Sequence, residues 1–163
     1  MSTKAKFELH ALNLGKLVGN LLTIEMAARM FLAKHDEDFQ SKIATQLPRV
    51  SEGDLVESDA FTNADDLRQT LQKYNKRAPN ALAVPIDEIV SLRDALAHGR
   101  TFGFGEIQHL RLLKFSRKAA EGKHRVELAQ DMSETWFVHN IRVLESALQS
   151  LTQALDYEQR EFD

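Results

Sequence analysis

The sequence predicts a mainly α-helical protein, an antiparallel bundle of four to five helices with a short β-hairpin inserted before the last helix. Apolar residues recur at three- and four-residue steps in long stretches near both ends of the chain. Proline and glycine separate the shorter helical stretches between them. A segment at about 107–130 alternates apolar and polar side chains, as strands do. The length of 163 residues fits a single domain over 1–163.

Residues 6 to about 34 are predicted to form the first helix. Its apolar positions make a wide stripe, so we expect this helix to be well buried. Those positions are Phe7, Ala11, Leu14, Leu17, Val18, Leu21, Ile24, Ala28, Phe31 and Leu32. Gly15 and Gly19 lie four residues apart within the helix, and each costs about 1 kcal/mol relative to alanine. Their spacing suits the close approach of another helix.

The middle of the chain holds an irregular segment and two shorter helices. Residues 35 to 63 are predicted to be a loop, because apolar periodicity is weakest there. Asn63, with an acid three residues later, resembles the N-cap of a helix over 64–77. Pro85 suits the first position of the next helix, which Gly99 is expected to terminate.

The predicted hairpin pairs residues 107–117 with 125–130, after a glycine-rich loop at 101–105. That loop lacks the preceding strand and the following Lys-Ser/Thr of a phosphate-binding loop. Ser133 is placed to cap the last helix. The apolar residues of this helix fall on a heptad repeat, at Phe137, Ile141, Leu144, Leu148, Leu151, Leu155 and Phe162. Such a seam indicates packing within a bundle, with a dimer seam as the alternative.

The composition excludes several classes of protein. The chain has no cysteine, which rules out disulfides, thiolate nucleophiles and cysteine-bound zinc. No stretch approaches the roughly 18 apolar residues of a membrane span. Met1 to His10 lacks the apolar run of a signal peptide. We therefore expect a cytoplasmic protein with no membrane partner. Histidines with helical ligand spacing are absent from the sequence, so we expect neither a metal nor another cofactor.

Positive charge is concentrated in one part of the chain. The formal net charge is −3, yet residues 100–125 hold seven lysines and arginines against two glutamates. This asymmetry indicates an anionic partner, and RNA is the one we expect. The candidate RNA-binding residues are Arg100, Arg111, Lys114, Arg117 and Lys118. A solvated basic hairpin without a partner is the alternative.

The segment most suggestive of chemistry is Arg93-Asp94-Ala95-Leu96-Ala97-His98. At about 100° per residue, Arg93 falls in the middle of an apolar face. The residues of that face are Ile86, Ile89, Val90, Leu96 and Ala97. Burying a guanidinium is costly unless it is paired. Asp94 and His98 are four residues apart, so their side chains can touch. A purely structural role is the alternative, with His98 at the helix C-terminus hydrogen-bonded to Asp94, and Arg93 in an internal salt bridge.

The stretch from Leu92 to Arg100 resembles the signature of the HEPN superfamily, in which an Arg and a polar follower precede a His at the end of a bundle helix. Arg93, Asp94 and His98 match these positions. The resemblance implies a metal-independent endoribonuclease that acts as a homodimer with its two motifs face to face. It also implies a toxin–antitoxin or phage-defence setting, with a protein antitoxin as a further partner. Arg100 occupies the position where some family toxins carry a modifiable tyrosine, so that form of regulation is not implied.

The residue types suit this chemistry. His98 would act as general acid or base, Arg93 would stabilise charge on the phosphate, and Asp94 would orient the imidazole. On a regular helix Arg93 and His98 lie about 140° apart, so convergence requires a distorted last turn or a second chain. Many superfamily members are inactive, which keeps open a non-catalytic helical interaction module or a nucleotide-binding module of the same fold.

Overall fold

The computed structural model describes most of the chain. The described ranges are 3–34, 49–56, 58–103 and 110–157. Parts of the predicted 35–63 loop, of the predicted hairpin and of the last heptad lie outside these ranges. The chain forms two compact units. Unit 1 contains residues 1–21 and 87–145, and unit 2 contains residues 22–86 and 146–163.

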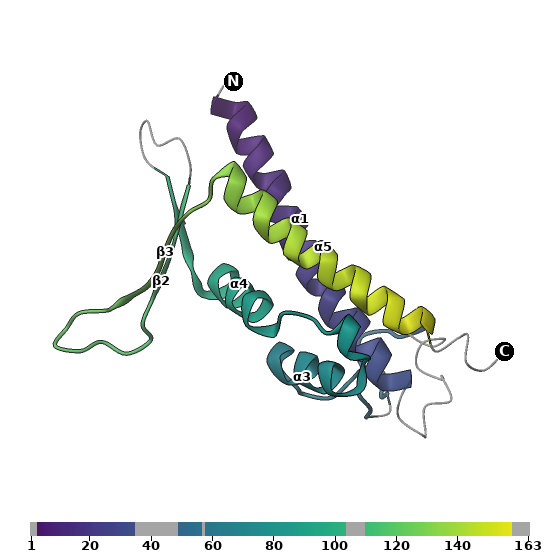
Figure 1. The fold of residues 1–163 in the computed structure, drawn as a ribbon. Helices are drawn as coiled ribbons and strands as arrows, with labels where there is room; N and C mark the ends of the chain where they lie inside the picture. Colours follow the sequence, from purple (N-terminus) through teal and green to yellow (C-terminus); the bar gives the residue numbers. More distant parts are fainter. Residues whose placement is uncertain (1–2, 35–48, 57, 104–109, 158–163) are drawn as a thin grey trace. The chain divides into compact units, whose positions relative to one another are not determined.

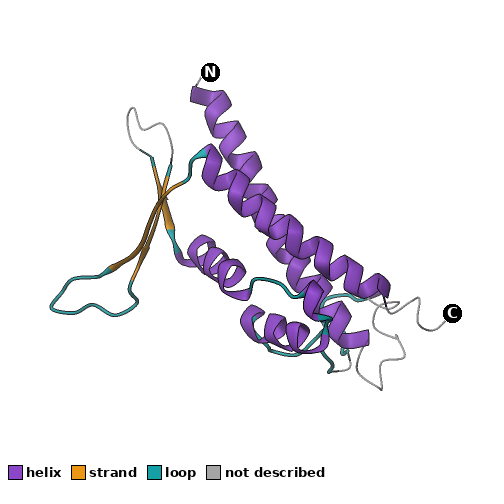
Figure 2. Ribbon diagram, in the orientation of Figure 1, coloured by secondary structure: helices purple, strands orange, loops and turns teal. Residues whose placement is uncertain are grey.

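The fold is mainly helical, with a three-stranded antiparallel sheet before the last helix, which confirms the predicted fold class (Figure 1). The helices of the described residues are α1 (Thr3–Lys34), α3 (Leu67–Arg77), α4 (Ile86–His98) and α5 (Glu134–Tyr157), with a 3-10 turn η2 (Asn80–Leu82). Figure 2 shows the strands between α4 and α5. They are β1 (Arg100–Phe102), β2 (Arg111–Phe115) and β3 (Val126–Asp131), in the order β1-β2-β3. Helices α1 and α5 contribute residues to both units.

In unit 1 the sheet follows α4 directly. Strands β2 and β3 form the predicted antiparallel hairpin. Glu121 (φ 54°) and Gly122 (φ 73°) close it with the two positive φ values of a type I′ turn. The sequence predicts a loop at 101–105, but the structure places the start of that segment in β1, where Arg100 lies opposite Leu113. A three-residue strand is too short to show alternation, and it forms here because distant β2 supplies its hydrogen-bonding partner.

Helix α1 is buried on one side only, whereas the sequence predicts a wide buried stripe. Leu17 and Ile24 are 0% exposed, but Phe7 is 56% exposed and Val18 is 43% exposed. An apolar stripe in a sequence does not distinguish residues that pack inside the chain from residues that remain on its surface. The exposed apolar residues of α1 are therefore a surface feature of the structure.

Within each unit, the α1 and α5 segments lie side by side and run in the same direction (Figure 1). In unit 1 the rings of His10 and Phe137 are 5.1 Å apart. In unit 2 Lys34 Nζ donates to the Leu155 carbonyl at 3.1 Å. For this pair the direction differs from the antiparallel one expected. Short loops make neighbouring helices antiparallel, but the long connection between α1 and α5 imposes no such constraint.

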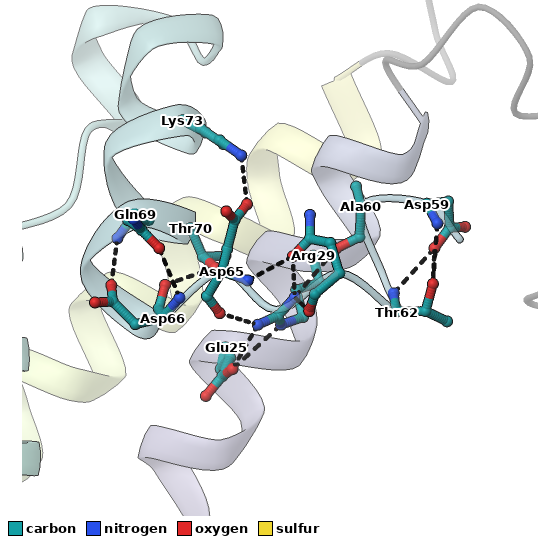
Figure 3. A network of polar contacts seen from close by, with 11 residues as sticks. Glu25, Arg29, Asp59, Ala60, Thr62, Asp65, Asp66, Gln69, Thr70 and Lys73 are labelled. Carbon is teal, nitrogen blue, oxygen red and sulfur yellow. Dashed lines mark hydrogen bonds and ion pairs between the residues drawn. The ribbon is translucent and has the colours of Figure 1, made fainter. Parts of the chain in front are cut away.

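In unit 2, Arg29 holds the segment before α3 against α1 (Figure 3). Its guanidinium donates to the Glu25 carboxylate at 3.0 and 3.2 Å. It also donates to the carbonyl oxygens of Ala60, Asn63 and Asp65, at 3.2, 3.3 and 2.6 Å. The Arg29 side chain is only 12% exposed. These bonds therefore satisfy a cation that is largely removed from water.

Asp66, rather than the predicted Asn63, caps α3. The Asp66 carboxylate accepts from the Gln69 amide at 2.8 Å, and the Gln69 side chain accepts from the Asp66 amide at 3.0 Å. This reciprocal pair is a capping box. Asn63 instead accepts from the Asp65 amide and from Arg29. Both residue types are good caps, and the presence of Gln69 at the third helical position decides between them.

The start of α5 and the end of α4 are as predicted. The α5 helix starts after Ser133, whose hydroxyl accepts from the Trp136 amide at 3.2 Å. The α4 helix ends at His98, directly before Gly99. Its first residue is Ile86, one position after the predicted Pro85. Local capping signals in the sequence were sufficient for the start of α5 and the end of α4.

Candidate functional site

The predicted motif lies on the α4 helix in unit 1. The helix is regular through His98, because the Gly99 amide still donates to the Ala95 carbonyl at 2.8 Å. The buried residues of the helix are Ile89, Val90, Leu92 and Ala95. Their side chains form the face that packs into the core of unit 1.

Around the helix axis Arg93 lies between buried Ile89 and Val90, as the sequence predicts. The side chains of Arg93 and Asp94 are each 35% exposed, and His98 is exposed. The long arginine side chain reaches water from this apolar face and keeps its guanidinium partly exposed. All three motif side chains are therefore accessible to a ligand.

The Asp94 carboxylate pairs with Arg93. Arg93 Nη1 lies 3.0 Å from Asp94 Oδ1. Among the described residues no hydrogen bond or ion pair joins Asp94 to His98, although their spacing on the helix makes such a contact feasible. In this structure Asp94 thus orients the guanidinium and not the imidazole.

The regular last turn of α4 limits what one chain can do. Arg93 and His98 lie about 140° apart around the helix axis. The intact hydrogen bond from Gly99 to Ala95 removes the distorted turn that would bring them together. A single chain therefore presents Arg93 and His98 in different directions, and convergence on one phosphate requires a second chain.

Gly99 joins the motif helix tightly to the sheet. A Cβ atom at Gly99 would lie 2.2 Å from the Ala95 carbonyl oxygen, 2.6 Å from Leu112 Cδ1 and 3.3 Å from the Leu113 carbonyl oxygen. Leu112 is 1% exposed, so it has little room to move. Only glycine permits this close approach, and His98 is consequently held at the edge of the sheet.

Three of the five predicted RNA-binding residues already have partners within the sheet. The Arg100 guanidinium lies over the Phe115 ring, 5.9 Å from its centroid. Arg111 is paired with Asp131 at 2.9 Å, and Lys114 with Glu127 at 3.8 Å. The two ion pairs, and not the contact of Arg100 with Phe115, neutralise part of the positive charge that the sequence concentrates here. Exposed ion pairs of this kind are weak.

The other two predicted residues, Arg117 and Lys118, lie beyond β2 in the turn region of the hairpin. Both are exposed, and neither forms an ion pair with a described residue. Of the ten residues 116–125, four are lysine or arginine and one is acidic. The end of the hairpin is thus the most positively charged exposed segment of unit 1.

Half-buried His10 was not singled out from the sequence. Its Nε2 atom is buried and has no hydrogen-bonding partner among the described residues. Burial lowers the pKa of His10 below the ordinary value of 6.5. The available signal was its position, because His10 continues the four-three spacing of buried Leu17 and Leu21 through Leu14. It packs edge-on against Phe137, which indicates a core residue rather than a ligand-binding one.

The described residues contain no group of three His, Cys, Asp or Glu side chains that could hold a metal ion. No helix in the described ranges is long and apolar enough to cross a membrane.

Comparison with known proteins adds no relative. No protein-family model, curated protein or solved structure matches this chain.

Proposed function

We propose that this chain is a HEPN-like, metal-independent endoribonuclease that acts as a homodimer. The observation that carries the proposal is the position of the motif. Arg93, Asp94 and His98 are accessible at the end of a regular helix, and only Gly99 separates His98 from the basic sheet. This arrangement supports the proposal, because an imidazole suited to proton transfer lies next in the chain to strands that carry arginine and lysine.

The proposed reaction uses the 2′-hydroxyl of the RNA. A base removes the proton of this hydroxyl, the 2′ oxygen attacks the adjacent phosphorus, and the bond from phosphorus to the 5′ oxygen breaks. An acid returns a proton to the 5′ oxygen, which leaves a 2′,3′-cyclic phosphate and a 5′-hydroxyl end. His98 of one chain would take up the first proton as the base and deliver the second as the acid, beside Arg93 of the other chain. Arg93 would stabilise the charge that develops on the phosphate oxygens.

The pairing of Arg93 with Asp94 is compatible with this role. At 35% exposure on each side chain, such a pair contributes about 0–1 kcal/mol. A phosphate offers the guanidinium two charged acceptors and a bidentate geometry. An incoming RNA phosphate would therefore displace the Asp94 carboxylate or bind the guanidinium beside it. Until then, the Asp94 carboxylate keeps the guanidinium extended from the helix.

The basic hairpin would guide the RNA backbone towards the motif. Arg117 and Lys118 are exposed cations. Arg100, two residues after His98, lies opposite Leu113, and Arg117 follows Leu113 by four residues. At about 3.3 Å per residue, the distance from Leu113 to Arg117 is roughly 13 Å, which a few nucleotides can span. Binding through such contacts is strongly dependent on salt. We further propose a cytoplasmic toxin or phage-defence setting with a protein antitoxin, as the resemblance implies.

A non-catalytic helical interaction module of the same fold, including one that binds a nucleotide, is the second candidate. The observation that favours it is the Arg93–Asp94 ion pair, because a structural role for Arg93 requires an internal partner. This candidate and the nuclease differ in one outcome, the cleavage of RNA.

The test compares two histidine variants in purified protein with EDTA present. His98→Ala should abolish RNA cleavage, while His139→Ala, a change at another exposed helical histidine, should leave it intact. Circular dichroism and sedimentation should show that both variants keep the fold and the oligomeric state. Unchanged cleavage in His98→Ala would remove His98 from the reaction. Absence of cleavage in the unmodified protein would favour the non-catalytic module.

A further inference from the structure

The three-stranded sheet of unit 1 has one open face. Paired residues point to the same side of a sheet, and successive side chains along a strand alternate between its two sides. The register therefore places these side chains together on one side: Arg100, Phe102, Arg111, Leu113, Phe115 and Val126. Leu112 lies on the other side, where it packs against Gly99 and is 1% exposed. That side belongs to the core of unit 1, and we call the first side the open face.

The open face combines aromatic, apolar and cationic side chains. Phe102 is 36% exposed and Val126 is 51% exposed. The Arg100 guanidinium lies over the Phe115 ring, 5.9 Å from its centroid, which is the geometry of a cation–π contact. A ligand that fits this face offers flat apolar surface to the rings and negative charge to the arginine. A phosphate backbone by itself supplies the charge but not the flat apolar surface.

Charge around the open face favours an anionic ligand. Arg111 is paired with Asp131 at 2.9 Å, whereas Arg100 forms no ion pair with a described residue. Phe115 ends β2, so the open face leads directly into the end of the hairpin at 116–125. That segment holds four lysines or arginines and one acidic residue. Aromatic rings and positive charge are thus continuous within one sheet, as on surfaces that bind single-stranded nucleic acids.

The two phenylalanines are spaced for more than one base. Phe102 lies opposite Arg111, and Phe115 follows Arg111 by four residues along the neighbouring strand. Four residues span about 13 Å and one strand spacing adds about 5 Å across the sheet, so the two Cα positions are about 14 Å apart. Leu113 and Arg100 lie between them. Sheets that carry such aromatic side chains stack two or three bases.

We propose that the open face is a stacking platform for the unpaired bases of single-stranded RNA. Bases stack on the Phe102 and Phe115 rings and on the Arg100 guanidinium, and the phosphates lie towards the basic end of the hairpin. A duplex is a poor ligand, because its bases are already stacked inside the helix and its surface offers mainly phosphates and 2′-hydroxyls. The inference rests on the proposed function and deepens it, since it names the form of RNA that reaches His98.

The test measures binding apart from cleavage. Its probe is a fluorescein-labelled single-stranded DNA of about 12 nucleotides, a length that single-strand-binding surfaces cover. Stacking needs only the face of a base, and this probe lacks the 2′-hydroxyl that the proposed reaction requires. Fluorescence anisotropy should show that the single strand binds at least about tenfold more tightly than the same strand annealed to its complement. Charge alone would favour the duplex, which carries more phosphates at higher density.

Substitutions at one ring separate stacking from charge. Phe102→Leu keeps an apolar side chain but removes the ring, and it should weaken binding of the single strand by at least about fivefold. The slope of log affinity against log salt should not change, because no phosphate contact is lost. Phe102→Tyr should bind like the unmodified protein. The control Phe7→Leu, the same change at a 56% exposed phenylalanine of α1, should leave binding unchanged.

Any of three results would overturn the platform. These are unchanged binding in Phe102→Leu, tighter binding of the duplex than of the single strand, and full displacement of the single strand by poly-glutamate of equal charge, which would assign the face to an acidic protein. Cleavage of RNA is scored separately. Phenylalanine-dependent binding without cleavage would keep the platform and remove the nuclease, whereas cleavage with unchanged binding in Phe102→Leu would do the reverse.

Discussion

Replacing Gly99 with alanine is expected to destabilise the protein by about 3 kcal/mol. The added methyl carbon would lie 2.2 Å from the Ala95 carbonyl oxygen and 2.6 Å from Leu112 Cδ1. Ordinary contacts of these types are about 3.3 Å and 3.5–4.0 Å, so both overlaps are close to 1 Å. Overpacking of a core costs about 1–3 kcal/mol. Displacing the Ala95 carbonyl also weakens the last hydrogen bond of α4, for about 1 kcal/mol more.

Urea denaturation at protein concentrations where the chain is monomeric would measure this loss. Gly15→Ala is the matched control, because its methyl group meets nothing within 4 Å. That control should raise the free energy of unfolding by about 0.5–1 kcal/mol. If the free energy of unfolding of Gly99→Ala lies within 1 kcal/mol of that of the unmodified protein, the close packing described between the motif helix and the sheet is wrong.

Three further perturbations test other parts of the structure. Arg29→Met should lower the free energy of unfolding by about 3 kcal/mol, because three carbonyl oxygens each lose a hydrogen-bond donor at roughly 1 kcal/mol. The control Arg142→Met, at an exposed arginine, should change the free energy of unfolding by less than about 0.5 kcal/mol. Alanine at both Arg117 and Lys118 should weaken RNA binding and reduce the slope of log affinity against log salt by about 1.4. Burial lowers the pKa of His10 in the folded state, so its contribution to stability is present above the unfolded pKa of 6.5 and is lost as the pH falls through the lower folded pKa. His10→Leu should therefore flatten the decline in the free energy of unfolding that begins as the pH falls below about 6.5.

Elements marked by local signals were predictable from the sequence. Ser133 marks the start of α5 and Gly99 marks the end of α4, because each signal acts on the backbone beside it. The hairpin was predictable for the same reason, since its turn residues and strands are neighbours in the chain. Strand β1 was not, because its hydrogen-bonding partner lies about ten residues away and three residues carry no recognisable period.

The chemistry of the motif and the position of Arg93 on its helix were readable from the sequence, but the exposure of its side chain was not. The 140° separation of Arg93 and His98 follows from helix geometry alone. Arg93 lies between buried Ile89 and Val90, yet its side chain is 35% exposed. Periodicity gives the face on which a residue lies, but it does not report how far a long side chain extends from that face.

The same limit applies to α1. Its apolar stripe was predicted to be buried, and part of it lies on the surface. Periodicity reports that a residue is apolar and on a given face. It does not report whether the element covering that face belongs to the same chain or to another copy.

The central claim is that each chain supplies half of an RNA-cleaving site. Mixing Arg93→Ala with His98→Ala tests it most directly, because each variant alone should be inactive. Subunit exchange makes about half of the dimers mixed, and each mixed dimer carries one intact Arg93 and one intact His98 from different chains. The mixture should recover roughly a quarter of the cleavage rate of the unmodified protein, at one intact pair per mixed dimer. A mixture no more active than either variant alone would contradict a site shared between two chains.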